Sequence, residues 1–346
     1  MRTDSFNDIP LPSFDHLRHM TSSLGLWEHA RYTTPRSDHG YCTDDNARAL
    51  LVISRQPEPT ADLIELGRIY MNFVQAASLS VGGFHNRRRA DGSWADAIGS
   101  DDSQGRAIWA LGVAARLGPE EWVRDAAREL FDAQDLVSDS PRANAYAVLG
   151  AAEVLGALPD HLRAQESIAS WVRHLRIGDN PSWPWPESRL AYDNARIPGA
   201  LIAAGTCLGD QDMVSNGIRL LDWLVSTETR DGHFSFAPAS GWALGEPRPG
   251  FDQQPLEATA FADACVRAWE VTGDEAWIGL VLAAARWLMG DNDVGAILYD
   301  AETGGGFDGL TPTGVNLNQG AESTLAALST LQTAAKVRAE SGITAL

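Results

Sequence analysis

Two groups of residues in this chain combine an aspartate doublet with an arginine at a spacing that could do chemistry. They are Asp44, Asp45 and Arg48 in TDDNAR, and Asp101, Asp102 and Arg106 in SDDSQGR. In each group one aspartate lies four residues before the arginine, so a helix can hold its carboxylate against the guanidinium. Acids at a helix start also act as caps, but a cap needs only one such residue. The doublets therefore predict that at least one aspartate of each pair faces a substrate.

Two glutamates are possible partners for these aspartates. Glu257 in QQPLEA and Glu322 in NQGAES occupy equivalent places in two short polar clusters. Glycoside hydrolysis needs two carboxyl groups on opposite sides of the scissile bond, one protonated and one ionised. The alternative for Glu257 is a capping box, because it falls at the third helical position if Pro255 is the first. We predict that Glu322 or Glu257 forms the catalytic pair with Asp102 or Asp45.

Aromatic and planar polar side chains near these clusters are of the types that bind sugars. A tryptophan offers a flat apolar face to the C–H side of a pyranose, and planar polar groups bind its hydroxyls. Any one loop tryptophan could instead be a hydrophobic plug, and a lone loop histidine is commonly structural. Besides Asp44, Arg48, Asp101 and Arg106, the predicted substrate-binding residues are His39, Asn86, Arg87, Trp94, Trp183, Trp185, Asp193, Arg196, Gln254, Asn318 and Gln319.

Charge and missing motifs argue against several classes of function. The formal net charge of −19 disfavours nucleic acids and anionic membranes as partners, because such binding depends on Lys and Arg. No second histidine groups with His39 at ligand spacing and the three cysteines form no CxxC pair, so no metal site is predicted. The chain lacks GxSxG, HExxH, GxxxxGK[ST] and a dinucleotide-binding GxGxxG. No cofactor is expected.

The elements that would position these residues recur along the chain. Polar clusters run into Ala/Leu-rich stretches about every fifty residues, a period typical of stacked helical hairpins; the clusters begin at Thr43, Asp101, Pro141, Asp193, Asp252 and Asn318. After the first turn these stretches are apolar nearly all round, which indicates inner helices. Amphipathic outer helices are predicted at 12–22, 59–77, 119–134, 159–176, 210–226 and 274–289. The predicted fold is an all-α, (α/α)6 double-ring toroid.

The links from outer to inner helices are long and rich in Gly, Trp and Phe, whereas the links from inner to outer helices are short. Long loops in a compact domain are commonly functional. The Asp-Gly pairs in ADGSW and TRDGHF predict short β-hairpins within these loops. The loops precede the inner helices, so we expect them to share one rim of the toroid with the polar clusters.

The chain is expected to form a single catalytic domain over residues 1–346, because a closed ring of repeats is one unit despite its length. No stretch approaches the roughly 18 uninterrupted apolar residues of a membrane helix. The first residues carry acids and prolines where a signal peptide has an apolar core. The prediction is a cytoplasmic protein that does not associate with membranes.

The polar clusters TDDNAR, SDDSQGR, AYDNAR, QQPLEA and NQGAES, with the Gly-aromatic loops, resemble the six-hairpin glycosidase superfamily across nearly the whole chain. HGYCTDDNARALL and NQGAESTLAAL also look like segments of bacterial proteins that occur fused to, or beside, glycosyltransferases. The resemblance implies the double-ring fold. It also implies a choice among glucoamylase-like and cellulase-like hydrolases, unsaturated-glycuronide hydrolases, disaccharide phosphorylases and sugar epimerases, and it assigns no catalytic residue.

The leading hypothesis is a glycoside hydrolase that acts on a small oligosaccharide or glycoside by an inverting, metal-free reaction. A sugar epimerase or isomerase would use the same ring but needs histidine bases for proton abstraction at carbon, and His39 is the one histidine that the sequence places near the rim. Three arginines in GGFHNRRR, at 87–89, leave a disaccharide phosphorylase or an anionic sugar open. A further alternative is a non-catalytic carbohydrate-binding partner of a glycosyltransferase.

Overall fold

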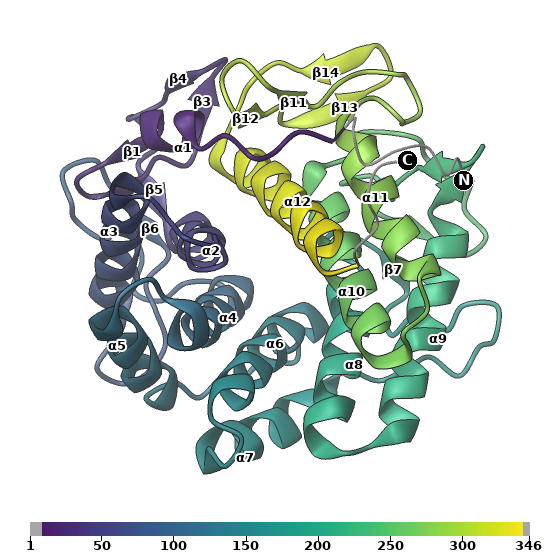
Figure 1. The fold of residues 1–346 in the computed structure, drawn as a ribbon, viewed down its shortest axis with the longest axis horizontal. Helices are drawn as coiled ribbons and strands as arrows, with labels where there is room; N and C mark the ends of the chain where they lie inside the picture. The colour runs from purple at the N-terminus through teal and green to yellow at the C-terminus, as the bar shows by residue number, and fades with distance from the viewer. Residues whose placement is uncertain (1–8, 342–346) are drawn as a thin grey trace.

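The computed structural model describes residues 9–341 and shows two concentric rings of helices (Figure 1). The inner ring consists of α2 (Thr43–Ser54), α4 (Asp101–Leu117), α6 (Pro141–Ala157), α8 (Arg196–Leu208), α10 (Pro255–Thr272) and α12 (Ala321–Glu340). The outer ring consists of α1 (Asp15–His19), α3 (Ala61–Ala77), α5 (Glu121–Asp132), α7 (Leu162–Trp171), α9 (Gln211–Thr227) and α11 (Ala276–Leu288). Each inner helix packs against the next, and contact of α12 with α2 closes the ring. The predicted (α/α)6 toroid is confirmed.

Small residues allow the inner helices to approach closely. A Cβ atom built on Gly112 of α4 would lie 2.1 Å from the carbonyl oxygen of Gly150 on α6. The two backbones therefore touch at this crossing, and no larger side chain fits between them. The alanine and glycine content that made these stretches apolar all round is thus a packing requirement of the inner ring.

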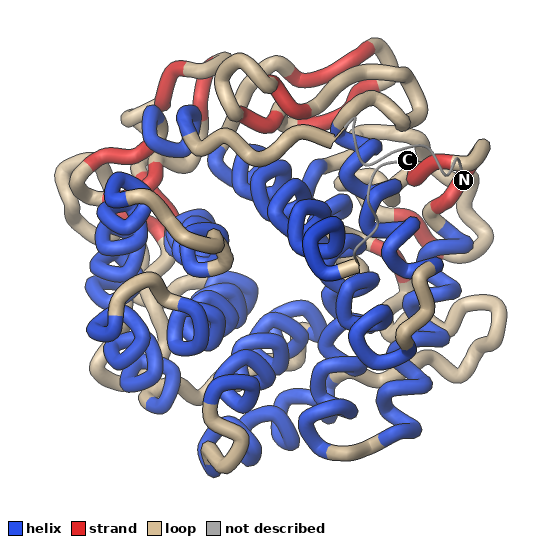
Figure 2. Tube along the Cα trace, in the orientation of Figure 1, coloured by secondary structure: helices blue, strands red, loops and turns tan. Residues whose placement is uncertain are grey.

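Fourteen short strands form antiparallel pairs among the described residues, all in segments between an outer helix and the next inner helix (Figure 2). They are β1 (Thr21–Ser22), β2 (Gly25–Leu26), β3 (Ala30–Arg31), β4 (Thr34–Pro35), β5 (Tyr41–Cys42), β6 (Arg87–Arg88), β7 (Arg189–Leu190), β8 (Thr229–Arg230), β9 (His233–Phe234), β10 (Trp242–Ala243), β11 (Tyr299–Asp300), β12 (Gly305–Gly306), β13 (Gly309–Thr311) and β14 (Gly314–Asn316). Because these segments lead into inner helices, the strands lie at the inner-helix N-termini. We call this end of the barrel the rim.

Several local predictions can be compared directly with the structure. The TRDGHF hairpin is confirmed as β8–β9, with Asp231 and Gly232 at positive φ of 50° and 89° in its turn. The first outer helix is shorter than predicted, because part of the 12–22 segment pairs as β1 with β2. The fourth outer helix, predicted at 159–176, ends at Trp171 and continues as a 3₁₀ turn, Val172–His174.

The prediction that the chain begins without a signal peptide was based partly on residues 1–8, and these lie outside the described residues. Within residues 9–341, no helix combines the length and the apolar content needed to span a membrane.

Candidate functional site

Six side chains near the starts of the inner helices form one layer of the barrel. They occupy equivalent positions in the repeat: Arg48, Arg106, Tyr146, Arg196, Glu257 and Glu322. An Arg48 nitrogen lies 2.8 Å from a Glu322 carboxylate oxygen, and an Arg106 nitrogen lies 2.9 Å from the Tyr146 hydroxyl. Side chains that are far apart in sequence therefore contact each other between neighbouring inner helices, within one layer of the ring.

The first part of this layer joins α2 to α12 through Arg48. Its guanidinium donates to Asp45 at 2.8 Å and to Glu322 at 2.8 Å. The Asp45 side chain is only 5% exposed, whereas 37% of the Glu322 side chain is exposed. Burial raises the pKa of Asp45 to about 7, with Arg48 opposing and Glu322 adding to the rise. A carboxyl group that titrates near neutrality thus lies beside a solvent-accessible one.

The second part of the layer is centred on Arg106 of α4. Arg106 donates to Asp44 at 2.8 Å and forms a longer, 3.5 Å ion pair with Asp102. The Tyr192 hydroxyl also donates a hydrogen bond to the Asp102 carboxylate, at 2.6 Å. Burial alone would raise the pKa of Asp44, but the charges of Arg106 and Arg48 hold it below its usual value. The side chains of Asp44 and Asp102 are each 16% exposed, so solvent reaches both carboxylates.

Asp193 and Arg196 continue the hydrogen-bonded network of the layer. The Tyr146 hydroxyl donates to Asp193 at 2.6 Å, and Arg196 donates to the same carboxylate at 3.1 Å. Arg196 also pairs with Asp263 of α10. Both residues, which were predicted to bind substrate, are buried and are hydrogen-bonded to other side chains of the network.

Glu257 has a different role from the predicted one. Its carboxylate accepts hydrogen bonds from the backbone N–H groups of Asp193 and Asn194. The capping-box alternative is wrong, because the Glu257 side chain does not bind the start of its own helix. Glu257 is 1% exposed and its pKa is raised well above the usual value, first by burial and then by the nearby Glu228. Of the four predicted catalytic carboxyl groups, only Asp102 and Glu322 are appreciably open to solvent.

The three tryptophans that were predicted to stack on a sugar differ in how far they are buried. Trp183 and Trp185 are buried and pack against Trp223 of α9, so they form hydrophobic plugs, the alternative given above. Trp94 is half-buried, with its ring stacked on His85 at a centroid distance of 4.9 Å. Among these three predicted platforms, Trp94 alone keeps part of its ring accessible at the rim.

Most of the remaining predicted polar residues hold rim loops in place. Asn86 accepts from the backbone N–H of Thr43 at 3.0 Å and so fixes the start of α2. Gln319 is buried and donates to Asp300 at 3.0 Å, while Asn318 accepts from the Tyr32 N–H at 3.0 Å.

The last four predicted residues lie nearer the surface. Asp101 accepts from Ser138 at 2.5 Å, and Gln254 precedes α10 without a side-chain cap. Arg87 is exposed and pairs with Glu28. His39 is exposed, with its ring 4.9 Å from that of His29. Arg87 and His39 are therefore accessible on the loops beside α2.

Sequence reasoning missed Tyr192 as a site residue, although a signal was present. AYDNAR aligns with TDDNAR, which places Tyr192 opposite Asp44 and Asp193 opposite Asp45. The structure repeats the correspondence, because Asp193 pairs with Arg196 as Asp45 pairs with Arg48, three residues along the chain in each case. Tyr192 then reaches Asp102 from the loop before α8.

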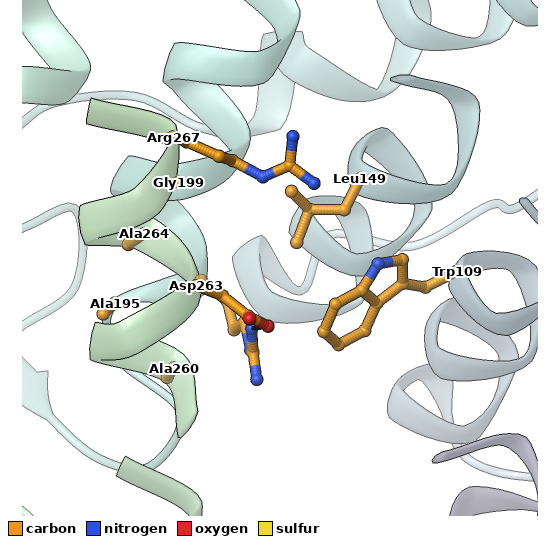
Figure 3. A pocket seen from close by; sticks show the side chains of 9 residues that line it. Trp109, Leu149, Ala195, Gly199, Ala260, Asp263, Ala264 and Arg267 are labelled. Atoms are coloured by element: carbon orange, nitrogen blue, oxygen red, sulfur yellow. Dashed lines mark hydrogen bonds and ion pairs between the residues drawn. The ribbon is translucent and has the colours of Figure 1, made fainter. Parts of the chain in front are cut away.

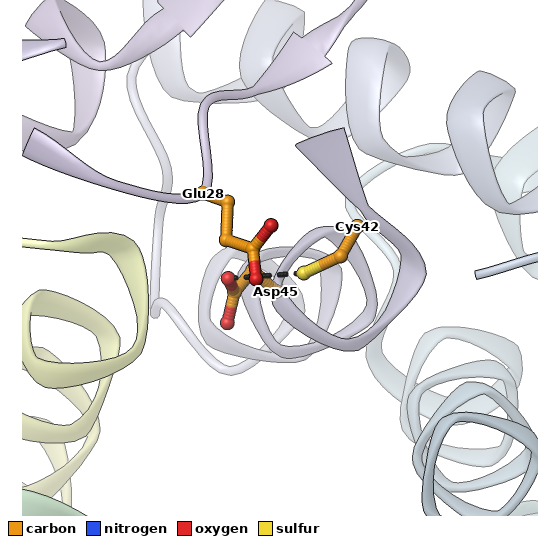
Figure 4. A group of neighbouring side chains, drawn as sticks. All are labelled: Glu28, Cys42 and Asp45. Carbon is orange, nitrogen blue, oxygen red and sulfur yellow. Dashed lines mark hydrogen bonds between the residues drawn. The ribbon is translucent and has the colours of Figure 1, made fainter. Parts of the chain in front are cut away.

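A second cluster that the sequence did not indicate consists of Glu28, Cys42 and Asp45 (Figure 4). One potential ligand atom from each residue lies within 4.8 Å of the others. The Cys42 thiol donates to Asp45 at 3.1 Å, and burial raises its pKa well above the usual value. A metal needs the thiolate, and here it would also compete with Arg87 and Arg48 for the carboxylates. The cluster is best described as a hydrogen-bonded support for Asp45.

The fold was compared with solved structures. The chain matches cellobiose 2-epimerase from Bacillus thermoamylovorans with a TM-score of 0.73 at 11% identity, over 94% of this chain and 96% of that one. A sugar epimerase from a ruminal bacterium gives 0.71 at 12% identity, over 92% and 94%. A GH76 α-mannanase from Bacteroides thetaiotaomicron gives 0.64 at 10% identity, over 94% and 93%. The chain shares its (α/α)6 toroid fold with these three proteins.

No protein-family model matches the sequence, and no curated protein matches it. At this level of identity the structural likeness shows the shared fold. It covers nearly the whole length of each of the three structures, so the toroid of this chain carries no large insertion or deletion relative to them.

Proposed function

We propose that this protein is a sugar-processing enzyme and that its reaction is the hydrolysis of a glycoside between Asp102 and Glu322 at the rim. The observation that carries the proposal is that two solvent-accessible carboxyl groups lie in the first turns of α4 and α12, the helices that flank α2 in the inner ring. Each carboxylate is held by a fixed donor, Tyr192 for Asp102 and Arg48 for Glu322.

This arrangement fits the chemistry of an inverting glycosidase. One carboxyl group protonates the leaving oxygen, while the other activates a water on the opposite face of the sugar. The proposal requires the two carboxyl groups to lie on opposite sides of the bound sugar at the spacing of inverting enzymes, roughly 6.5 to 9.5 Å.

The test is the release of reducing sugar from a panel of oligosaccharides and aryl glycosides. Asp102→Asn and Glu322→Gln are each expected to lower kcat/KM by at least about 10³-fold, because each removes a carboxyl group that acts in the transition state. Asp125→Asn on the outer helix α5 is the matched control and should retain activity. NMR of the first product should show an inverted anomeric centre. Full activity in either rim variant would refute the pair.

A second candidate is a sugar epimerase or isomerase, supported by two observations. The two epimerase structures give higher TM-scores than the mannanase, and Asp45, with a pKa of about 7, is suited to proton transfer at carbon. Against it, none of the six inner helices, within their described bounds, carries a histidine.

Incubation of reducing sugars in D2O separates the two candidates. An epimerase or isomerase that exchanges its abstracted proton with solvent incorporates deuterium next to the carbonyl, whereas a hydrolase leaves that position unlabelled. Deuterium incorporation without release of a new reducing end would favour the second candidate. Inactivity in both assays would favour the non-catalytic carbohydrate-binding role, in which a partner glycosyltransferase supplies the chemistry.

A further inference from the structure

Side chains from four inner helices fill the middle of the barrel below the layer of polar residues. Figure 3 shows Asp263 and Arg267 of α10 together with Trp109 of α4 and Leu149 of α6. The space that these residues and their neighbours enclose measures only about 10 Å³, which is close to the smallest volume that holds one water. A saccharide longer than the site therefore extends outward, past the rim loops, and its further contacts come from those loops.

One groove at the rim, with a volume of about 510 Å³, lies between the β3–β4 hairpin and the segment that leads from β14 into α12. We call it the hairpin groove. Its volume is within the range of about 300 to 1,000 Å³ typical of small-molecule sites. The backbone N–H of Gln319 donates to the Tyr32 carbonyl at 2.9 Å, which ties the hairpin to the chain three residues before Glu322. The groove therefore lies beside the start of the helix that carries one proposed catalytic carboxyl group.

The lining of the hairpin groove is basic. It contains two arginines, Arg31 and Arg36, and no aspartate or glutamate. Arg36 is neutralised by Asp38, which lies outside the lining and accepts from it at 2.8 Å. Arg31 is exposed, and its guanidinium has no ion pair within residues 9–341. The groove therefore carries one guanidinium charge that no carboxylate of the described structure neutralises.

The side chains of Asn316 and Asn318 add further hydrogen-bond donors to the lining. Their oxygens are already used, because Asn318 accepts from the Tyr32 N–H at 3.0 Å and Asn316 accepts from the Asn318 N–H at 3.2 Å. Each amide therefore presents its NH2 group, and the Arg31 guanidinium presents five N–H donors and no acceptor. Neither residue is buried. Such a groove fits a ligand that is rich in acceptor oxygens.

Tyr32 is an unusual residue for its position in the turn of the β3–β4 hairpin. Its φ is 53°, a conformation that favours Gly, Asn or Asp and is an outlier for a bulky residue. Tyr32 is 57% exposed, and among the described residues its ring packs on no other aromatic ring and its hydroxyl has no hydrogen-bond partner. Neither the turn nor the core accounts for a tyrosine here, whereas a stacking face for a sugar does.

A second groove at the rim, of about 370 Å³, is less suited to an anion. It is lined by the three arginines at 87–89, but also by Asp38 and Asp91. Arg87 pairs with Glu28, and the other two arginines donate to backbone carbonyls. The arginine run that left an anionic sugar open in the sequence is thus occupied in the structure, whereas Arg31 is not.

We propose that the hairpin groove binds a uronic-acid residue of the substrate, so that the enzyme acts on an acidic oligosaccharide. Arg31 binds the carboxylate, the two asparagine amides donate to the sugar oxygens, and the Tyr32 ring stacks on the C–H face. One unneutralised guanidinium matches the single charge of a carboxylate better than the charge of about −1.5 to −2 on a phosphate ester. The inference rests on the proposed function, because the rest of the saccharide must reach the carboxyl groups of α4 and α12.

Calorimetric titration of the full chain with tetrasaccharides tests the proposal. The probes are tetramers of galacturonate, mannuronate and glucuronate, each paired with its methyl ester, which lacks the charge. Where the wild type hydrolyses a probe, Asp102→Asn replaces it. At least one free acid should bind with a Kd in the millimolar range or below, and at least about tenfold more tightly than its ester. If no free acid binds more tightly than its ester, the proposal is overturned.

The proposed subsite and the proposed hydrolysis fail separately in these measurements. Release of reducing sugar from neutral glycosides, with no preference for a free acid in binding, would support hydrolysis and refute the subsite. Binding of a free acid that is never hydrolysed would support the subsite and count against hydrolysis.

Two variants test whether the acid binds in the hairpin groove. Arg31→Gln should remove the preference for the free acid and leave binding of the ester unchanged. Tyr32→Gly should weaken binding of both about three- to tenfold without lowering Tm, because glycine adopts the positive φ more readily. A fall in Tm would show that Tyr32 serves the fold and remove it from the subsite.

The matched control is Arg338→Gln in the last turn of α12, at the end of that helix far from the rim. Arg338 is also exposed, and it too lacks an ion pair in the part of the chain that the structure describes. Its variant should bind each probe as the wild type does. A retained acid preference in Arg31→Gln, or an equal loss in Arg338→Gln, would place the acid elsewhere and refute the subsite.

Discussion

Two buried carboxyl groups beneath the rim, Glu228 and Glu257, should make the stability of the fold depend on pH. Both contact Asn194: its backbone N–H donates to Glu257 at 3.2 Å, and its side-chain amide to Glu228 at 3.4 Å. Glu228 is fully buried, and one of its oxygens has no partner within residues 9–341. Burial raises the pKa of both groups, and for Glu257 the neighbouring Glu228 adds to the rise. At least one of the two carboxyl groups is therefore protonated in the folded protein at neutral pH.

The sign of the pH dependence follows from these raised pKa values. In the unfolded chain a glutamate titrates near its ordinary pKa of about 4.3. Below that value both states are protonated and the pair has no pH-dependent cost. As the pH rises toward the raised folded-state pKa, the unfolded chain releases its protons and the folded protein does not, so the free energy of unfolding falls.

Glu228→Gln removes one titrating group and should abolish much of the fall in the free energy of unfolding at high pH. Burial raises the pKa of Glu228 to about 8, and at about 1.4 kcal/mol per pKa unit the difference from its ordinary value corresponds to about 5 kcal/mol. At the average unfolding entropy per residue, that difference shifts Tm by roughly 7 °C for a chain of this length. The variant should come closest to the wild type at the acid end of the range and be more stable by this order at pH 8.

The measurement is thermal and urea unfolding of both proteins from pH 4.5 to 9, followed by circular dichroism. Glu166→Gln, which removes an exposed carboxyl group from α7, is the control and should follow the wild type at every pH. If Glu228→Gln and the wild type lose stability in parallel between pH 5 and 8, the two glutamates do not retain a proton and the reasoning is refuted.

Three further perturbations test other parts of the structure by the same unfolding measurements. Gly112→Ala should lower the free energy of unfolding by about 1 to 3 kcal/mol, because the new methyl group meets the Gly150 carbonyl; a neutral result would show that α4 and α6 can separate. Trp185→Ala should cost about 3 to 5 kcal/mol as a buried ring is replaced by a cavity, and a loss below 1 kcal/mol would contradict its role as a plug. Arg48→Gln should cost about 3 to 5 kcal/mol at pH 8, where Asp45 loses its counter-ion. The loss should be smaller at pH 5.5, where Asp45 is neutral; equal losses at both pH values would show that Asp45 is ionised throughout.

The repeat pattern was sufficient to predict the architecture, for a physical reason. A helix that is apolar on every side can only be buried, and an amphipathic one can only lie at a surface. Alternation of the two kinds along the chain therefore determines an inner and an outer ring before any contact is known. The boundaries were less predictable, because a residue such as Asp193 adopts a positive φ of 52° just before α8 and delays the start of that helix.

The site was only partly predictable. Local spacing paired Arg48 with Asp44, four residues before it, which is wrong, because Arg48 donates to Asp45 and Asp44 accepts from Arg106. The alignment of clusters placed Glu322 at the same repeat position as Arg48. Sequence spacing could not show that Arg48 joins Asp45 to Glu322, because their helices are distant in the chain and adjacent only after ring closure. It also could not show that Tyr192 reaches Asp102, since Tyr192 lies in the loop before α8 and Asp102 in the first turn of α4, 90 residues earlier.

By itself, the sequence determined the helical toroid, the rim on which the polar clusters gather and the acidic character of that rim, because periodicity and composition are properties of short segments. Only the tertiary structure decided which carboxyl groups are exposed. Burial depends on what packs above a residue from elsewhere in the chain, and this is why Asp102 and Glu322 remain accessible while Glu257, at an equivalent repeat position to Glu322, is enclosed.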